Sequence, residues 1–295
     1  MRALIIAALF WVQFPVAQAA EVAAQAEGHG IPLHAVEIFN IGPFPITNSI
    51  LVTWLVALGI ILFARMATRQ MREVPEGAQN FLEWLVEGLY DFLVGIIGST
   101  LAKKTFWFFA SIFIFILSAN WFGLIPGVGT IGWGHAGEHG FQVTEPLLRG
   151  VNADLNMTFA MAMIFFFLWT VWALQINGIK GFVLHIFGAP KGDMQGFMKF
   201  AMGAVFLLVG LLEVVSILFR PVSLSFRLFG NIYAGENMLE AMSNIVPKLN
   251  WLIPVPFYFM ELLVGLIQAM VFMLLTAVFT LLICQHEEEH GPAQH

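Results

Sequence analysis

Charged side chains are scarce in this sequence. Only 11% of its 295 residues are Asp, Glu, Lys or Arg, whereas 59% are hydrophobic. Soluble domains carry about 25% charged residues, so this chain has too little charge to cover a water-facing globule of its size. Several apolar runs reach the ~20 residues that are needed to cross a bilayer. The composition predicts an integral membrane protein.

Cysteine and basic clusters are almost absent as well. The single cysteine, Cys284, excludes an intramolecular disulfide framework, and no Lys/Arg-rich run suggests nucleic-acid binding. Two histidines in a glycine-rich loop, His135 and His139, could bind a metal, but no third ligand is suitably spaced. The tail from 284 to 290 could also do so, although a solvated acidic tail is the commoner meaning of such a pattern. We therefore expect no metal and no other cofactor.

The N-terminus has the pattern of a secretory signal. Arg2, a short apolar run and small residues before Ala20 predict a possible signal peptide over 1–19. An uncleaved interfacial segment is the alternative. Residues 20–47, which contain several Gly and Pro, then form an exported N-terminal loop. We expect a membrane domain over 48–285 and a cytoplasmic tail over 286–295.

Apolar runs predict five transmembrane spans, at 48–65, 105–126, 155–175, 197–243 and 251–284. Residues 79–99 differ, because Glu83, Glu87 and Asp91 stack on one face of an otherwise apolar helix. That pattern is typical of a helix lying on the membrane surface. The expected fold class is an all-α integral membrane protein with five spans and one amphipathic surface helix.

The basic residues predict the orientation of these spans. Lys and Arg concentrate on cytoplasmic segments of membrane proteins. Two basic residues fall in segments assigned to the outside, and eight in segments assigned to the cytoplasm: Arg65, Arg69, Arg72, Lys103, Lys104, Lys180, Lys191 and Lys199. We expect a multi-pass protein of the cell inner membrane, with its N-terminus outside and its C-terminus in the cytoplasm.

The last two apolar segments are unusually long. Residues 197–243 contain no clear loop, and a helix of this length would measure about 70 Å at ~1.5 Å per residue. It fits a bilayer only by tilting steeply or by bending, and Pro221 supplies a place to bend. We expect the last two helices to be long and steeply tilted.

Polar residues recur at helical spacing along the first of these long segments. They step by three or four residues and so share one face: Glu213, Ser216, Arg220, Ser223, Arg227 and Asn231. An arginine inside a membrane costs about 2.5–3.5 kcal/mol on insertion scales, so each one needs a partner, water or both. A salt bridge between Glu213 and Arg220 is the structural alternative for those two residues. Arg227 has no acid one turn away on either side.

Further ionisable groups lie beyond this stripe. Glu236 and Glu240 occupy the outer end of the same helix, where exposed interface acids are the simplest interpretation of Glu240. Glu261 and Gln268 are seven residues apart in the last helix and share a face. An ionisable residue within a span is by default a candidate for an ion pathway. Glu261 is such a residue.

Four motifs carry a resemblance to a known family. The run PVSLSFRLFGNIYAGE closely resembles the signature of subunit a of the rotary F-type ATP synthase, and LLVGLIQAMVFMLLT resembles its final helix. Weaker similarity extends through ILSANWFGLIPG and NADLNMTFAMAM, so that it covers about residues 45–285. The resemblance implies a non-catalytic, ion-translocating stator subunit of the membrane sector. Its implied partners are the c-subunit ring, b-type peripheral stalk subunits and membrane lipid.

The resemblance also implies roles for single residues. Arg227 is similar to the essential arginine that faces the ring of c subunits. Asn231, Glu236, Glu261 and Gln268 correspond to the outer aqueous half-channel, whereas Ser223, Arg220 and Glu213 lie towards the inner one. Several relatives carry His where Glu261 stands, so the sharing of protons between Glu236 and Glu261 is open. The transported ion is expected to be a proton, and the residues leave Na⁺ open.

Two other classes of protein compete with this interpretation. A proton-coupled secondary transporter would also place ionisable residues at mid-membrane, but it predicts paired repeats and broken helices, and the sequence has no such symmetry. A membrane anchor for a larger complex would leave Arg227 unexplained.

Overall fold

The computed structural model describes residues 35–41, 44–125, 128, 131–137, 140–187, 197–245 and 252–284. The possible signal peptide over 1–19 and the tail over 286–295 lie outside the described residues, as does most of the expected exported loop. The domain boundaries predicted for those segments therefore stay predictions.

Helices dominate the described part of the chain. They are α2 (Asn48–Thr68), α3 (Ala78–Ile97), α4 (Ser99–Gly123), α5 (Leu155–Phe187), α6 (Phe197–Ile245) and α7 (Pro254–Cys284). By length and composition, five segments can cross a membrane: Asn48–Thr68, Ser99–Gly123, Leu155–Leu184, Val205–Ser243 and Pro254–Cys284. The amphipathic α3 is not among them. The fold class predicted from the sequence is confirmed.

Glycines in left-handed conformations set two of the helix boundaries. Gly98, with φ of 77°, separates α3 from α4, so α4 begins at Ser99 and not near 105. Gly178, with φ of 66°, kinks α5, which then continues to Phe187, beyond the predicted end at 175. The apolar residues after Gly178 keep a helical pattern, and only glycine adopts this backbone angle without strain. The segment expected as a connection is thus partly helical.

Two short antiparallel hairpins are additions that the sequence pattern did not predict. β1 (Glu37–Ile41) pairs with β2 (Phe44–Thr47), directly before α2. β4 (Gly132–Gly137) pairs with β5 (Gly140–Pro146), between α4 and α5. Asn48, which directly follows β2, connects the two hairpins: its side-chain amide donates to the carbonyl of Pro146 at the end of β5, at 2.8 Å.

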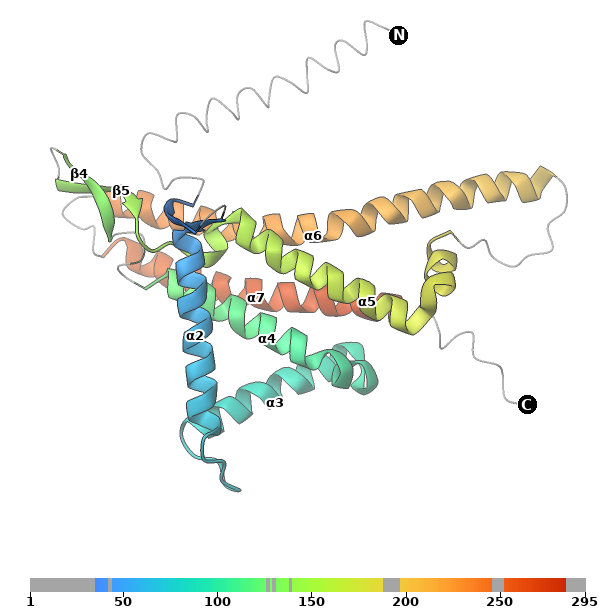
Figure 1. Cartoon of the computed structure of the whole chain (residues 1–295), viewed down its shortest axis with the longest axis horizontal. Coiled ribbons are helices and arrows are strands. Elements are labelled where there is room, and N and C mark those ends of the chain that lie inside the picture. The colour runs from blue at the N-terminus through green and yellow to red at the C-terminus, as the bar shows by residue number, and fades with distance from the viewer. Residues whose placement is uncertain are drawn as a thin grey trace, which may run out of the picture.

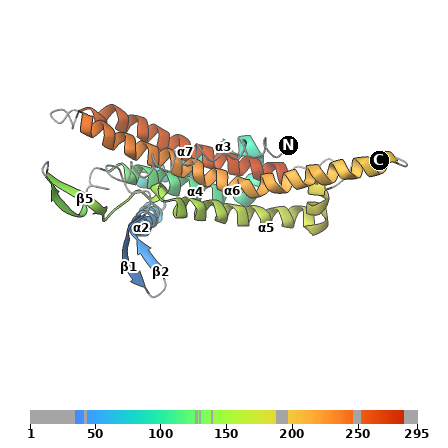
Figure 2. The ribbon, with the colours of Figure 1, turned by 90° about the horizontal axis from the view of Figure 1, so that it is seen from above.

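The last two helices, α6 and α7, run side by side and cross the direction of α2 (Figure 1). Figure 2 shows α2 nearly end-on, whereas α6 and α7 still extend along the molecule. α6 has 49 residues and contains Pro221 within its length. If α2 crosses the bilayer close to the bilayer normal, α6 and α7 are steeply tilted. This arrangement supports the steep tilt that we expected from the length of the last two helices.

The apolar core lies between α4, α5, α6 and α7. Phe109 of α4, Phe165 of α5, Leu228 of α6 and Met273 of α7 are its large, fully enclosed side chains. Side-chain donors from α4 and α5 also bind backbone carbonyls of α7. The pairs are Trp121–Leu262, Asn120–Gly265, Trp169–Phe279 and Asn177–Ile283, at 2.9–3.1 Å. α7 is therefore fixed along most of its length.

Candidate functional site

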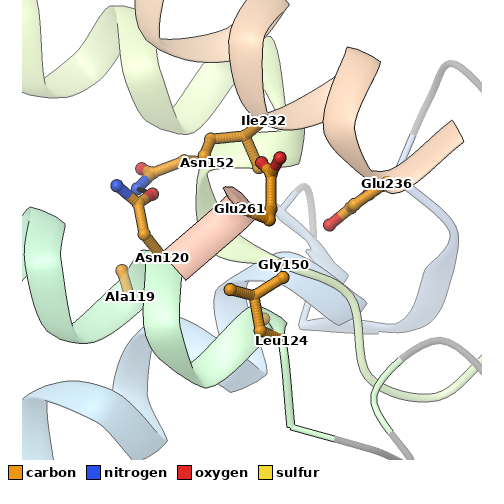
Figure 3. Close-up of a pocket in the computed structure, with 9 residues that line it drawn as sticks. Ala119, Asn120, Leu124, Gly150, Asn152, Ile232, Glu236 and Glu261 are labelled. Atoms are coloured by element: carbon orange, nitrogen blue, oxygen red, sulfur yellow. Dashed lines mark hydrogen bonds between the residues drawn. The ribbon is translucent and has the colours of Figure 1, made fainter. Parts of the chain in front are cut away.

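A small pocket with two acids among its lining residues lies where four segments of the chain meet. Its lining residues come from α4, from the connection that contains the short 3₁₀ helix η1 (Val151–Ala153), from α6 and from α7. Figure 3 shows Glu236 and Glu261 on its walls, together with Asn120, Asn152 and Gly150. The structure thus brings together two of the acids that the sequence singled out.

Glu261 is buried on α7 and points towards α6 (Figure 3). Only 4% of the residue is exposed, and its Oε1 atom has no hydrogen-bond partner among the described residues. The carboxylate lies against the α-carbon of Gly235, so closely that a Cβ at that position would overlap it. Burying a carboxyl group without a partner is costly. The buried Oε1 atom of Glu261 therefore needs a hydrogen-bond partner that the described residues do not supply.

Glu236 approaches the same pocket from α6. In Figure 3 its side chain points towards Gly150 of the connection between α4 and α5. A Cβ on Gly150 would stand 2.5 Å from Oε1 of Glu236, so the glycine makes room for the carboxylate. The two acids are close enough for their charges to act on each other. Like charges so placed disfavour simultaneous ionisation.

Two asparagines form a fixed chain of hydrogen bonds on the pocket wall. Asn120 donates from Nδ2 to the carbonyl of Gly265 at 3.0 Å, and its Oδ1 accepts from Nδ2 of Asn152 at 2.6 Å. Because the carbonyl can only accept, the orientation of both amides is determined. These two hydrogen bonds link η1, α4 and α7, and they reach α7 at Gly265, one helical turn beyond Glu261.

Arg149 is a buried cation beside this pocket. It is 2% exposed, and its Nη2 donates to the carbonyl of Ala153 at 2.9 Å. Burial lowers the pKa of Arg149, whereas the neighbouring carboxylates of Glu236 and Asp154 raise it. Arginine starts from a pKa above ~12, so the guanidinium keeps its charge here. The acid pocket therefore has a permanent positive neighbour.

A second polar cluster lies further along α6. Arg220 donates from Nη2 to Oε1 of Glu213 at 2.9 Å. The guanidinium also lies over two aromatic rings, 5.7 Å from the centre of Trp169 and 4.7 Å from that of Phe279. The salt bridge that the sequence left as an alternative is thus present. We call these four residues the arginine clamp.

Arg227 has a different environment, although it stands on the same helix. Its side chain is exposed, and within the described part of the chain it forms no ion pair. Ser223, Gly230 and Ala234 are exposed with it, at steps of three or four residues. We call this strip of α6 the open face. It carries an unneutralised charge among small residues.

The remaining predicted site residues are spread along α6 and α7. Asn231 and Gln268 are half-buried, and neither lines the pocket among the described residues. Ser223 belongs to the open face and Glu213 to the arginine clamp.

Sequence reasoning missed several residues in and around the pocket. Asn120, Gly150 and Asn152 on its wall, and Arg149 beside it, were not singled out, because they lie far from the two acids in the chain. Gly235 was missed although it precedes Glu236 in the signature motif, because a glycine has no side chain to mark it. Helical spacing detects neighbours only within one helix. Asn120 and Asn152 did lie within motifs that carried the resemblance, which was the available signal.

Comparisons with known proteins agree with this architecture. A model of the family described as ATP synthase A chain matches residues 50–280. The chain is similar to ATP synthase subunit a of Moorella thermoacetica, with 32% identity over 244 residues, which covers 83% of this chain and 94% of the relative. It is also similar to ATP synthase subunit a of Gloeobacter violaceus, with 31% identity over 280 residues, 92% of this chain and 99% of the relative.

The fold and the pocket define a multi-pass membrane protein with ionisable groups between its spans. With a match over most of its length, the chain belongs to the ATP synthase A chain family. It is a membrane subunit of F-type ATP synthase and takes part in ATP synthesis and ion transport.

Proposed function

We propose that this chain is the non-catalytic stator subunit that carries protons to and from a rotating c-subunit ring. In this proposal it provides two aqueous half-channels, which open on opposite sides of the membrane. A proton enters through the outer one and neutralises a ring carboxylate, and after nearly a full turn that carboxylate releases its proton to the inner one.

The open face of α6 is the observation that carries the proposal. Arg227 stands there exposed, and within the described part of the chain it forms no ion pair. An intramembrane charge left without a partner inside its own chain calls for one outside it. Small residues around it let another helix approach closely. A ring carboxylate is the partner of matching charge.

The remaining polar groups fit the two half-channels on either side of Arg227. The pocket with Glu236 and Glu261 supports an outer half-channel, to which Asn231 and Gln268 would contribute. Glu213, Arg220 and Ser223 lie towards the other end of α6 and would serve the inner one. Arg227, which cannot pass on a proton, would separate the two and would favour the ionised form of a passing carboxyl group.

The proposal includes further partners and an orientation. Relatives are named as subunits of ATP synthase, and b-type peripheral stalk subunits would hold this chain against the ring. The N-terminus would lie outside and the C-terminus in the cytoplasm, as the basic residues predict.

The central experiment replaces Arg227 by alanine and reconstitutes the complete complex in vesicles. We expect ATP-driven acidification to vanish, because the ring carboxyl has no cation against which to release its proton. Passive proton conduction should persist or rise, because the barrier between the half-channels is gone. The two fluxes are measured separately, after the assembly of the complex has been checked. Normal ATP-driven acidification in the Arg227→Ala complex would refute the mechanism.

The orientation has its own test. Single cysteines at Gly140 and His290, introduced after the native Cys284 has been replaced by alanine, should react with a membrane-impermeant reagent from opposite sides. The Cys-less chain is the control for background labelling. Labelling of both positions from one side would contradict the predicted topology.

A further inference from the structure

A buried arginine, Arg149, stands next to the acid pocket but outside the membrane-spanning helices. It lies in the connection that leads from β5 to η1, and it is 2% exposed. One of its hydrogen bonds goes to the carbonyl of Ala153, which belongs to the same connection. A neutral carbonyl does not balance a buried positive charge. The compensation must come from nearby acids.

Two carboxylates act on Arg149 through their charges: Glu236 on α6 and Asp154 directly before α5. Tyr233 on α6 is a third titratable neighbour. Asp154 already has donors of its own, because its carboxylate accepts from Ser49 Oγ and from the backbone N–H of Asn156. Glu236 reaches the connection at Gly150, the residue next to Arg149, whose missing side chain leaves space for the carboxylate. Glu236 is thus the pocket acid that shares its surroundings with the cation.

Glu261 has other surroundings. It approaches from α7, and its carboxylate lies against Gly235 of α6. Its Oε1 atom is buried without a hydrogen-bond partner among the described residues. Among those residues, Glu236 is the charged group on the pocket wall that faces it. A buried carboxyl without a cation is better accommodated in its neutral form.

We propose that Arg149 is a positioning residue that holds the negative charge of the acid pair on Glu236, so that their shared proton resides on Glu261. This inference rests on the proposed function. It assigns a protonation state to each of the two acids of the outer half-channel. In enzyme active sites, too, two neighbouring carboxyl groups in different environments can take different roles, one as the protonated acid and the other as the carboxylate. Glu236, as the carboxylate, accepts the next proton from outside. Glu261, as the carboxylic acid, gives its proton onward.

The experiment replaces Arg149 by glutamine in the complete complex, reconstituted in vesicles with its outer face accessible. Proton flux is measured as a function of pH on that face. Without the cation, Glu236 takes up its proton more readily, so the midpoint of the pH profile should move to higher pH by about one unit, a tenfold change in proton concentration. Arg149→Lys keeps the charge and should leave the midpoint close to that of the unmodified complex.

Double variants identify the residue through which Arg149 acts. In a Glu236→Gln background, Arg149→Gln should cause no further shift, because the group that it controls is gone. In a Glu261→Gln background the shift should persist. Arg69→Gln is the matched control, because Arg69 is an exposed arginine at the far end of α2, and it should not move the midpoint. A shift of equal size in the Glu236→Gln background would overturn the inference.

Arg149 is buried, so its replacement can prevent assembly. Gly150→Ala is the second variant, because its Cβ would displace the Glu236 carboxylate from its place beside the arginine. It should shift the midpoint in the same direction. Gly59→Ala, at an exposed position of α2 with open space around it, should not. An unshifted profile in assembled Arg149→Gln or Gly150→Ala complexes would overturn this inference alone. A lack of proton flux through the unmodified complex would overturn the proposed function itself.

Discussion

Arg220 and Arg227 stand two helical turns apart on α6, yet their surroundings are opposite. Arg220 is closed in by Glu213, Trp169 and Phe279, and its side chain is 19% exposed. Arg227 is exposed on the open face and forms no ion pair with the described residues. The chain satisfies the first arginine internally, whereas the proposed function gives the second a partner in another subunit.

This contrast shows how one helix can neutralise one arginine within the chain and leave another open. An aromatic ring attracts a cation over its face, by about 0.5–2 kcal/mol, and a neighbouring carboxylate adds to that stabilisation. The arginine clamp also joins three helices, because Trp169 lies on α5, Arg220 on α6 and Phe279 on α7. Among the described residues, no such contacts are present at position 227. Sequence spacing offered Glu213 as a partner for Arg220 and none for Arg227, but it did not reveal the two aromatic rings.

The largest effect should come from replacing each arginine by lysine in turn. Arg227→Lys should abolish ATP-driven acidification, because a desolvated ammonium can lose its proton and lacks the donors of a guanidinium. Arg220→Lys keeps the charge beside Glu213 and should retain most of the activity. Both variants are compared in vesicles with equal amounts of assembled complex. Equal losses at the two positions would remove the distinction between them.

An intermediate effect is expected where α6 is tightly packed against an acid. Gly235→Ala places a methyl group where the Glu261 carboxylate lies. Proton flux should therefore fall by roughly tenfold, which corresponds to an increase of ~1.4 kcal/mol in the activation free energy. Gly203→Ala is the matched control, because this exposed glycine on the same helix has open space around it. Flux is measured at a fixed membrane potential. Similar flux in the two variants would show that the close contact between Gly235 and Glu261 does not contribute to proton transport.

The smallest effect should follow from weakening the arginine clamp. Trp169→Phe removes the indole N–H that donates to the carbonyl of Phe279, at a cost of about 1 kcal/mol. The temperature at which the complex loses activity should fall slightly, while coupling at 25 °C stays intact. Trp54→Phe, at an exposed position of α2, is the control. A loss of coupling without a loss of thermal stability would give the clamp a direct role in transport.

The sequence predicted the helical frame well, for physical reasons. Long apolar runs must form helices in a membrane, because each backbone group needs a hydrogen bond within its own segment. The amphipathic α3 followed from Glu83, Glu87 and Asp91 on one face. The hairpins were missed because β4 and β5 consist of glycine-rich and mixed residues without alternation. The extension of α5 was missed because Lys180, Lys191 and Lys199 assigned the segment after 175 to the cytoplasm.

The candidate site was predicted only in part. Glu236 and Glu261 stood out because a carboxyl group within an apolar run is rare and costly. Their meeting in one pocket depends on how α6 and α7 pack, which no spacing within a helix encodes. Gly150 and Gly235 leave space for the carboxylates of Glu236 and Glu261 because they have no side chain. Arg149 is buried beside the pocket because of the way in which the connection between α4 and α5 folds. Such contacts require the three-dimensional arrangement.

The hydrogen bonds from α4 and α5 to the carbonyls of α7 have a consequence for the order of biosynthesis. α7 is the last described helix to leave the ribosome, yet it supplies Glu261 and receives donors such as Asn120 and Trp121, which were made long before it. Until α7 is inserted, those donors lack their acceptors, and the pocket lacks one of its two acids. If the pocket belongs to the outer half-channel, as we propose, an unfinished chain has no complete path for protons, and the membrane is protected from leakage while the subunit is being made.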